Sequence, residues 1–327
     1  MNTFGTRFRI HIFGESHGEG VGIVIDGMPA GIPLCAEELE ADLARRRAGA
    51  AGTTPRRESD VPHFVSGLYE GHTTGAPLTL LFRNENTRSG DYARLHAHFR
   101  PSHADWTGAA KFGGMNDPRG GGHFSGRLTL PLVAAGAVAK KLLDGIRFAT
   151  RVVEIGGQSD PGRMDEAIRR AAREGDSVGG IVACTAEGVP AGWGDPFFDA
   201  AESLIAHLLF AVPGIKGVEF GAGFEAARMR GSVHNDPILD AEGHTATNHA
   251  GGIAGGITNN NPLLVRAAFK PTASIARPQT TYNAATGRME PLEIGGRHDV
   301  CIALRGAVAV EAAVAVALAD LKLRNAF

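Results

Sequence analysis

Apolar and polar positions alternate in short runs of this chain and recur with helical spacing in longer ones, which predicts a mixture of strands and helices. The expected strands cover residues 8–13, 21–25, 65–69, 77–82, 152–157, 178–185, 214–221 and 262–269. The expected helices cover residues 36–47, 128–143, 164–174, 200–210 and 307–323. Residues 84–98 are polar and are expected to be irregular.

Two of the expected helices are apolar on all sides. Residues 128–143 read LTLPLVAAGAVAKKLL, and residues 307–323 are rich in alanine and valine. A helix that is hydrophobic all round is buried in a core. We therefore expect both helices inside the molecule, whereas residues 164–174 are amphipathic and belong at its surface.

One strand–turn–helix pattern occurs twice. The turn GMPAG begins at Gly27 and the turn GVPAG begins at Gly188, 161 residues later, and each turn lies between a glycine-flanked strand and a helix. This recurrence indicates an internal duplication, with units at roughly 8–145 and 150–327. Because no linker rich in proline or serine separates the units, we expect a single domain over residues 1–327.

Composition describes a globular protein and excludes several classes. The chain has 327 residues, of which 43% are hydrophobic and 21% are charged. Its formal net charge is −2, so the overall charge gives no indication of nucleic-acid binding. No apolar run is long enough for a signal peptide or a membrane span. The three cysteines are widely separated, which predicts neither a disulfide framework nor a zinc site. We expect a cytoplasmic protein with no metal site and no membrane partner.

Residues 100–127 carry the strongest chemical signal. They combine Arg100, Arg119 and Arg127 with His103 and His123, and they contain seven glycines, three of them consecutive. Arginines bind carboxylates and phosphates, histidines exchange protons near neutral pH, and glycines let a backbone approach a ligand closely. This mixture predicts an ordered loop over a polyanion; a solvated, glycine-rich surface loop is the alternative.

Four other stretches have the same character, and the first three have a plain structural alternative. They are residues 14–18, with a histidine at a strand end; residues 45–57, with five arginines around a loop; residues 270–274, with a lysine and two hydroxyls; and residues 295–299, with glycines, cations and an acid. The first could be an incidental turn, the second a helix cap with a solvated loop, and the third a polar turn fixed by proline.

Taken together, five stretches resemble the chorismate synthase family. They are FGESHG at 13–18, RRR followed by TTPRRESD within 45–60, RPSHAD at 100–105, GGITNNNPLLVRAAFKPTASI at 255–275 and GRHD at 296–299. The resemblance implies an α+β fold, a β-α-β sandwich in keeping with the duplicated unit, and a homotetramer. It also implies a lyase of the shikimate pathway, which leads to the aromatic amino acids. The expected substrate is 5-enolpyruvylshikimate 3-phosphate, converted to chorismate by 1,4-anti elimination of phosphate. The reaction needs non-covalently bound, reduced FMN, for which NADPH is a candidate reductant.

The same resemblance assigns roles to individual residues. His17 would be the general acid beside the departing phosphate, His103 would lie against the flavin, and Asp299 would help the flavin N5 accept the substrate's proton. The expected substrate-binding residues are Ser16, Arg46, Arg100, Ser125 and Arg127. The expected FMN-binding residues are His123, Phe124, Ser125, Pro213, Gly214, Gly255, Lys270, Pro271, Thr272, Ala273, Ser274 and Arg297.

The chain departs from the family pattern at several of these positions. Where the family commonly reads GGGRSSARET, residues 120–129 read GGGHFSGRLT, so His123, Phe124 and Leu128 replace an arginine, a serine and a glutamate. Gly52 stands where an anion-binding arginine is usual, and residues 213–214 read Pro-Gly where Asn-Ala or Pro-Ala is common. These changes bear on the flavin and substrate contacts more than on the reaction.

Two other functions remain open at the level of sequence. A flavin reductase or another FMN oxidoreductase would consume NAD(P)H without a shikimate-pathway substrate. A non-catalytic protein that binds anions or RNA through the arginine loops would show steeply salt-dependent RNA binding and no flavin affinity. The scarcity of lysine and the near-neutral net charge disfavour the second alternative.

Overall fold

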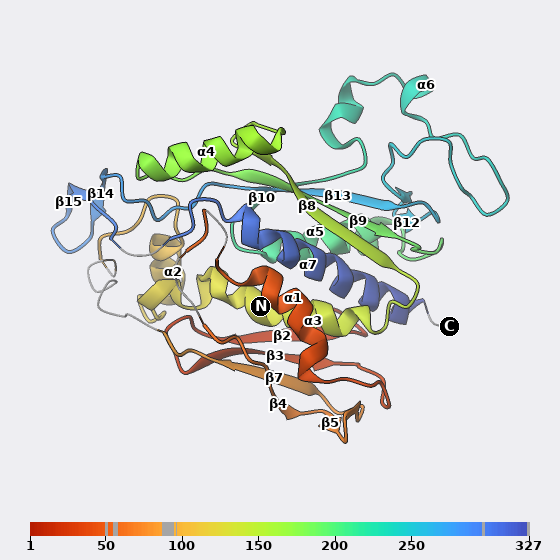
Figure 1. Ribbon diagram of the computed structural model, residues 1–327, viewed down its shortest axis with the longest axis horizontal. Coiled ribbons are helices and arrows are strands. Elements are labelled where there is room, and N and C mark those ends of the chain that lie inside the picture. The colour runs from red at the N-terminus through yellow and green to blue at the C-terminus, as the bar shows by residue number, and fades with distance from the viewer. Residues whose placement is uncertain (50–51, 55–57, 87–94, 96, 296–297, 326–327) are drawn as a thin grey trace.

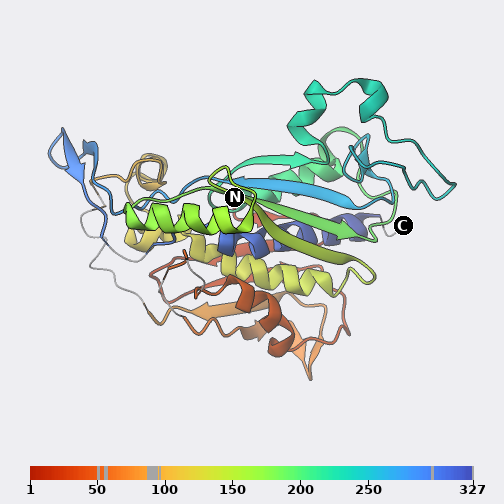
Figure 2. The same ribbon diagram turned by 45° about the horizontal axis from the view of Figure 1, so that its top comes forward.

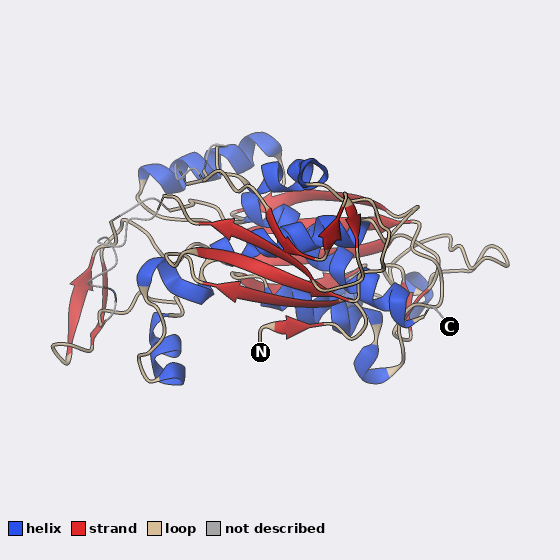
Figure 3. Ribbon diagram, turned by 90° about the horizontal axis from the view of Figure 1, so that it is seen from below, coloured by secondary structure: helices blue, strands red, loops and turns tan. Residues whose placement is uncertain are grey.

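A computed structural model describes residues 1–49, 52–54, 58–86, 95, 97–295 and 298–325. Its strands form two antiparallel sheets that lie on opposite sides of a layer of helices (Figure 1). Figure 2 shows these layers from an oblique angle, and Figure 3 views the molecule from below, so that the layers overlap. The expected β-α-β sandwich is therefore confirmed.

The first sheet comes from the N-terminal part of the chain. Its strand order is β1-β2-β3-β7-β4, and every neighbouring pair is antiparallel. Strand β3 and strand β7 alternate buried and less buried residues, as a sheet with one face on the core requires. The bounds are β1 (Thr3–Phe4), β2 (Arg9–Gly14), β3 (Gly20–Asp26), β4 (His63–Ser66), β7 (Leu78–Arg83) and the small hairpin of β5 (Leu68–Tyr69) and β6 (His72–Thr73).

The second sheet has the order β10-β13-β9-β8, again antiparallel throughout. Its strands are β8 (Arg147–Ile155), β9 (Gly180–Glu187), β10 (Ile215–Phe220) and β13 (Leu263–Phe269). Two separate hairpins extend from it, formed by β11 (Ile253–Ala254) with β12 (Ile257–Thr258) and by β14 (Gln279–Asn283) with β15 (Arg288–Leu292). Figure 1 draws these hairpins at opposite ends of the molecule.

Four helices fill the space between the sheets in the described part of the chain. They are α1 (Ala36–Arg46), α3 (Thr129–Lys140), α5 (Ala201–Ala211) and α7 (Ala303–Arg324). Helices α3 and α7 lie at the centre, and both are buried on nearly every side, as their composition predicted. They approach closely because Gly136 faces Ala312: a Cβ at residue 136 would lie 2.4 Å from the Ala312 Cα.

The remaining helical segments lie around this core. The amphipathic α4 (Pro161–Arg173) packs against β8, the edge strand of the second sheet. Helix α2 (Asp105–Phe112) and the 3₁₀ turns η2 (Arg119–Phe124) and η3 (Gly126–Leu128) occupy the stretch expected to be a loop. The other short segments are η4 (Phe197–Asp199), η5 (Gly223–Arg228) and α6 (Gly231–His234).

The two GxPAG turns are held by matching contacts. The Thr73 hydroxyl donates to the Pro29 carbonyl at 2.6 Å and accepts from the Ile32 amide at 3.0 Å. The Thr258 hydroxyl donates to the Pro190 carbonyl at 2.6 Å and accepts from the Trp193 amide at 2.9 Å. Equivalent threonines therefore close equivalent turns, which supports the duplication inferred from the sequence.

Most predicted elements are found within a few residues of their expected bounds, and the misses have physical causes. The stretch 100–127 was expected to be a loop, but Asp105–Phe112 is helical. This segment is too short for its apolar residues to show a helical period in the sequence. Strand β8 begins at Arg147 rather than at residue 152. The prediction missed its first residues because exposed residues recur among them, so that part shows no clear hydrophobic pattern. The β14–β15 hairpin was not expected. Much of the predicted irregular segment 84–98 lies outside the described residues. In the described part, no helix is long and apolar enough to cross a membrane.

Candidate functional site

The consecutive glycines of η2 bring two predicted catalytic histidines to one backbone segment. A Cβ placed on Gly120 would lie 2.6 Å from His17 Nε2, and a Cβ placed on Gly121 would lie 3.4 Å from His103 Cε1. Both glycines have φ values, +60° and +82°, that favour glycine. The Ser16 amide also donates to the Gly122 carbonyl at 3.1 Å. The glycines thus provide the space in which both imidazoles lie.

His103 belongs to a partly buried hydrogen-bonded group with Asp105 and Arg100. His103 Nδ1 lies 2.6 Å from Asp105 Oδ1. Arg100 contacts both carboxylate oxygens, with Nη2 2.7 Å from Oδ1 and Nε 2.7 Å from Oδ2. Burial alone would raise the pKa of Asp105, but the hydrogen bonds from Arg100 and His103 outweigh burial and hold that pKa well below its ordinary value. Asp105 is therefore a carboxylate with two permanent partners.

A second loop, residues 270–274, packs against this group. Arg100 Nη1 donates to the Ser274 hydroxyl at 3.0 Å, and Lys270 Nζ donates to the Ser102 carbonyl. The Thr272 hydroxyl donates to the Asp299 carbonyl at 2.7 Å. This loop follows β13 directly, so the end of that strand positions residues on both the His103 side and the Asp299 side of the site.

Asp299 is joined to Arg46 through Arg305. The Asp299 carboxylate accepts from the Thr54 amide at 2.7 Å and from Arg305 Nη1 at 3.1 Å. Arg305, in the first turn of α7, also donates through Nε to the Arg46 carbonyl at 2.9 Å. The start of the central helix therefore fixes the third predicted catalytic residue against the end of α1.

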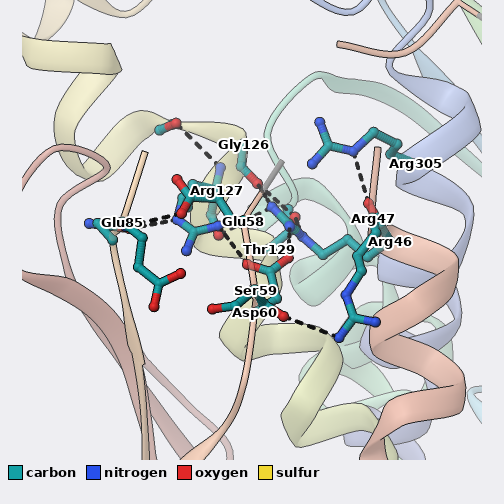
Figure 4. Close-up of polar contacts among 12 residues, drawn as sticks. Arg46, Arg47, Glu58, Ser59, Asp60, Glu85, Gly126, Arg127, Thr129 and Arg305 are labelled. Carbon is teal, nitrogen blue, oxygen red and sulfur yellow. Dashed lines mark hydrogen bonds and ion pairs between the residues drawn. The ribbon is translucent and has the colours of Figure 1, made fainter. Parts of the chain in front are cut away.

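Arg46 and Arg127 point toward one carboxylate, that of Asp60 (Figure 4). Arg127 Nη1 lies 2.8 Å from Asp60 Oδ1, and Arg46 Nη1 lies 3.6 Å from Asp60 Oδ2. All three side chains are buried, and Asp60 has a φ of +51° that is unusual for a residue other than glycine. Arg46 Nη1 has no hydrogen-bond partner among the residues that the structure describes. A buried guanidinium with an unused donor is suited to an incoming anion.

Asn84 closes these contacts into a ring. Its side-chain oxygen accepts from Arg127 Nε at 2.6 Å, and its side-chain nitrogen donates to the Glu15 and Gly18 carbonyls, which flank His17. These contacts lead back to residues 14–18, the loop that carries His17. In order, it passes through His17, Gly120, Gly121, His103, Asp105, Arg100, Ser274, Thr272, Asp299, Arg305, Arg46, Asp60, Arg127 and Asn84.

The three arginines at the end of α1 have different partners. Arg45 donates to both oxygens of the buried Glu311 at 2.8 Å, and Arg47 pairs with Glu40 on its own helix. Only Arg46 is directed into the ring. The expected anion lid around residues 45–57 is thus reduced to one inward arginine in the described part, while Arg56 and Arg57 lie outside it.

Comparison with known proteins shows which family the chain resembles. The family model described as chorismate synthase matches residues 8–323. A chorismate synthase from Chitinophaga pinensis is 57% identical over 324 residues, covering 99% of this chain and 97% of the relative. One from Dehalococcoides mccartyi is 46% identical over 352 residues, covering 99% and 97%. The chain belongs to the chorismate synthase family. A crystal structure of chorismate synthase superposes with a TM-score of 0.74 at 28% identity, covering 98% of this chain and 93% of the other.

The chorismate synthase family is a family of lyases, and the predicted site residues were assigned by resemblance to it. The structure brings together most of them: the three predicted catalytic residues, the predicted substrate residues and the loop 270–274 all belong to the ring or directly adjoin it. Ser125 adjoins it because its hydroxyl accepts from the Arg127 amide at 3.3 Å. Pro213 and Gly214 lie beside the same loop, since the Gly214 carbonyl accepts from the Lys270 amide at 2.9 Å.

Gly255 is the exception among the described residues. It forms the turn of the β11–β12 hairpin, which precedes β13, whereas Lys270 follows β13. Seven strand residues at about 3.3 Å each put roughly 20 Å between the two ends. Gly255 is therefore not part of the same cluster within one chain. Arg297, the remaining predicted FMN residue, lies outside the described residues.

The departures from the chorismate synthase pattern have structural explanations. His123 binds the Gly14 carbonyl at 2.8 Å and the Asn2 side chain at 3.1 Å, so it anchors η2 to the first sheet. Gly52 has a φ of +86°, its carbonyl accepts from the Val300 amide, and a Cβ there would lie 2.6 Å from Ile168. Leu128 is buried in the core. In this chain His123 thus makes hydrogen bonds that hold the fold together, and Gly52 and Leu128 serve close packing.

Phe124 has a different environment, because it lines a small hollow beside η2. The hollow is lined by His103, Ala109, Asn116, Pro118, Gly121 and Phe124, among others. The hollow has a volume of only about 20 Å³, so in this structure it does not accommodate an isoalloxazine ring as it stands. The types of residue present are nevertheless compatible with the cofactor that the chorismate synthase family implies: two aromatic rings and a glycine backbone lie here, and a lysine and two hydroxyls lie in the adjoining loop 270–274.

Sequence analysis missed four members of the ring: Asp60, Asn84, Asp105 and Arg305. Asp60 and Asp105 lie inside the quoted motifs RRESD and RPSHAD, so their types were visible without their partners. Asn84 and Arg305 lie outside every motif. Arg305 contacts the Arg46 carbonyl across 259 positions of the chain, a separation that no local pattern encodes.

Proposed function

We propose that this protein converts 5-enolpyruvylshikimate 3-phosphate to chorismate by 1,4-anti elimination of phosphate, with reduced FMN bound non-covalently. The observation that supports it best is the closed ring of contacts that gathers His17, His103 and Asp299 with buried arginines. The substrate carries two carboxylates and a phosphate, and guanidinium groups are the protein's best ligands for such anions.

Arg46 and Arg127 would hold the substrate's anionic groups, with Ser16 and Ser125 donating hydroxyl hydrogen bonds beside them. Arg46 is the better placed of the two, because its Nη1 is buried and has no hydrogen-bond partner among the described residues. Arg100 would contact the substrate from one side only, since most of its guanidinium donors already bind Asp105 and Ser274.

His17 would donate a proton to the departing phosphate. It is largely buried and packs against the Gly120 backbone, so its imidazole is held in one orientation. A positioned histidine is an effective general acid because its ordinary pKa is close to neutral pH.

His103 and Asp299 would handle protons on the cofactor side. Reduced FMN, when bound, would supply the transient electron that the elimination needs. Burial lowers the pKa of the His103 imidazole, and so do the charges of Arg100 and Lys270, while the hydrogen bond to Asp105 opposes them. His103 would therefore be neutral at pH 7 and able to accept a proton. The Asp299 carboxylate would help carry the substrate's proton toward the flavin N5.

The phosphate of FMN would bind the loop 270–274 together with Arg297, and Pro213, Gly214, His123, Phe124 and Ser125 would form the rest of the flavin site. In one chain this set excludes Gly255, which stands at the other end of β13. We further propose a cytoplasmic homotetramer in which NADPH is a candidate reductant of FMN. Analytical ultracentrifugation of the purified protein tests the assembly.

The decisive experiment is an anaerobic assay with chemically reduced FMN and 5-enolpyruvylshikimate 3-phosphate. We expect stoichiometric release of phosphate and formation of chorismate, with no net oxidation of the flavin. Absence of phosphate release with correctly folded, flavin-bound protein would refute the proposal. Steady consumption of NAD(P)H without substrate would indicate a flavin oxidoreductase instead.

A parallel assay with NADPH and oxidised FMN alone separates two versions of the function. Turnover under argon would mean that the protein reduces its own cofactor. Turnover only after chemical reduction would mean that the reductant is supplied by another source.

A further inference from the structure

We propose that Asp105 is a positioning residue that fixes the tautomer and orientation of His103, and that Arg100 serves first to hold Asp105 in place. This inference rests on the proposed function. It gives a role to Asp105, to which neither the family pattern nor the sequence assigned one. It also changes the principal role of Arg100, which was predicted to bind the substrate.

The geometry around Asp105 is fixed from both sides. Arg100 binds the carboxylate through Nε and Nη2, both at 2.7 Å, and the Arg100 backbone amide adds a third contact at 3.1 Å to Oδ2. Arg100 is in turn tied to Ser274. The side chains of Arg100 and Asp105 are 4% and 9% exposed, so water competes little for these contacts. A planar, two-point pair of this kind allows little rotation of the carboxylate.

This arrangement determines the protonation of His103. A carboxylate that accepts two hydrogen bonds from a guanidinium is ionised and can only accept. The 2.6 Å contact from His103 Nδ1 to Asp105 Oδ1 therefore requires a proton on Nδ1. In the neutral imidazole the lone pair then lies on Nε2, on the ring edge that faces Gly121 and the hollow. Asp105 thus aims the proton-accepting nitrogen of His103 at the proposed flavin position.

The charged groups that face His103 act on its pKa in opposite directions. Asp105 raises that pKa, whereas Arg100 and Lys270 lower it. His298 is also close enough for its charge to interact with that of His103. Because Asp105 is the nearest acidic partner, its removal should lower the His103 pKa further and reverse the tautomer. An asparagine with its NH₂ in the Oδ1 position would donate to His103 Nδ1, which leaves the proton on Nε2, and it would lose the hydrogen bond that Oδ1 now accepts from Arg100 Nη2 while keeping the one from Arg100 Nε.

The test is Asp105→Asn in the full-length protein, measured under argon with reduced FMN. We expect kcat to fall by about 10²–10⁴-fold, the range found when a catalytic histidine takes the wrong tautomer, with KM and FMN affinity changed by less than about threefold. Asp240→Asn is a matched control, because Asp240 pairs with His244 at 2.8 Å on an exposed loop. Its kcat should stay within about twofold of wild type.

A double-mutant cycle distinguishes positioning from a general structural effect. In the His103→Ala background, adding Asp105→Asn should change kcat by less than about twofold, because a residue that acts through His103 has nothing left to position. A full multiplicative loss would overturn the proposal. If Asp105→Asn does not fold, Asp105→Glu takes its place; it keeps the charge and should lose less activity than Arg100→Lys, which breaks the two-point pair.

A readout independent of turnover is the hydrogen–deuterium exchange of the histidine C2 proton, followed by mass spectrometry across pH in the protein without cofactor. We expect the His103 pKa to be lower in Asp105→Asn than in wild type. An unchanged pKa would overturn the proposal even if activity is lost. Wild-type protein that makes no chorismate would instead refute the proposed function and leave this result interpretable.

Discussion

Burial decides how the charged side chains of the site behave. Burial lowers the pKa of Arg46, and the positive charges of Arg305 and Arg127 lower it further, while Asp60 partly offsets them. A guanidinium in this position gains more from an anionic ligand than an exposed one would, because the ligand replaces solvation that the fold has removed. If Arg46 binds the substrate as proposed, substrate binding and the electrostatics of the free protein are coupled at this residue.

His17→Ala tests the general acid. We expect kcat to fall by about 10²–10⁴-fold, because the departing phosphate loses its proton donor, with FMN still bound. Phosphate release under argon and flavin titration measure the two quantities. His63→Ala, an exposed position on β4, should be close to wild type. Undiminished turnover in His17→Ala would remove the assigned role.

Asp299→Asn tests the proton acceptor. The carboxylate is fixed by the Thr54 amide and Arg305, and asparagine keeps the shape while removing the charge. Chemistry should slow by about 10²-fold or more while KM changes little. Single-turnover kinetics separate the two steps, and Asp165→Asn on the exposed face of α4 is the control. A loss confined to affinity would mean that Asp299 binds rather than reacts.

At the scale of elements, η2 shows how a glycine run can act as a spacer for side chains from elsewhere. Gly120→Ala should lower kcat by at least about 10-fold, because the new methyl group would lie 2.4 Å from His17 Cδ2 and must displace the imidazole. Gly113→Ala is the matched control. Its φ of +58° nearly equals the +60° of Gly120, but a Cβ there has nothing within 4 Å. Equal effects of both substitutions on kcat would mean that backbone strain alone matters.

The crossing of α3 and α7 depends on Gly136 in a different way. Alanine is a better helix former by about 1 kcal/mol, but its Cβ would overlap Ala312 at 2.4 Å. Overpacking should win, so Gly136→Ala should destabilise the protein by about 1–3 kcal/mol. Thermal melting measures the difference. Gly162→Ala, at the exposed start of α4, should leave the melting temperature unchanged or slightly raised.

The sequence predicted these elements correctly where the local hydrophobic pattern matches the burial of the residues. The apolar helices 128–143 and 307–323 were found because a continuous run of small apolar residues has few places except a core. Helix α2 was missed, since Gly108 and a short, mixed sequence conceal it. The ring was predicted only in part. His17, His103, Asp299 and the inward arginines were expected from the sequence. Asp60 and Arg305 were not, because they act through partners 67 and 259 residues away, which only the fold brings together.

At the scale of the whole molecule, buried charges link the helices of the middle layer. Glu311 of α7 binds Arg45 of α1 at 2.8 Å and Lys140 of α3 at 2.6 Å. Burial alone would raise the pKa of Glu311, but hydrogen bonds and charges from Arg45 and Lys140 lower it to about 2. One carboxylate thus joins three helices that are widely separated along the chain.

Glu311→Gln should reveal this link through pH. The folded pKa of about 2 lies below the unfolded value of 4.5, so the stabilisation is present above about pH 4.5 and is lost as the pH falls toward 2. The shift corresponds to about 3 kcal/mol near neutral pH. Melting temperatures of wild type and Glu311→Gln should differ most near pH 7 and converge in acid. Glu166→Gln, which removes exposed pairs on α4, should change little at any pH.

Helix α7 is the innermost element of the sandwich, yet it follows both sheets in chain order. A ribosome therefore delivers the two outer layers before the helix that must lie between them. Until Arg305 and Glu311 emerge, Asp299 and Arg45 each lack one charged partner, and α3 lacks the helix that packs against it at the centre. We therefore expect the sandwich to be completed only after this helix has left the ribosome, and the chain to be most prone to aggregation before that point.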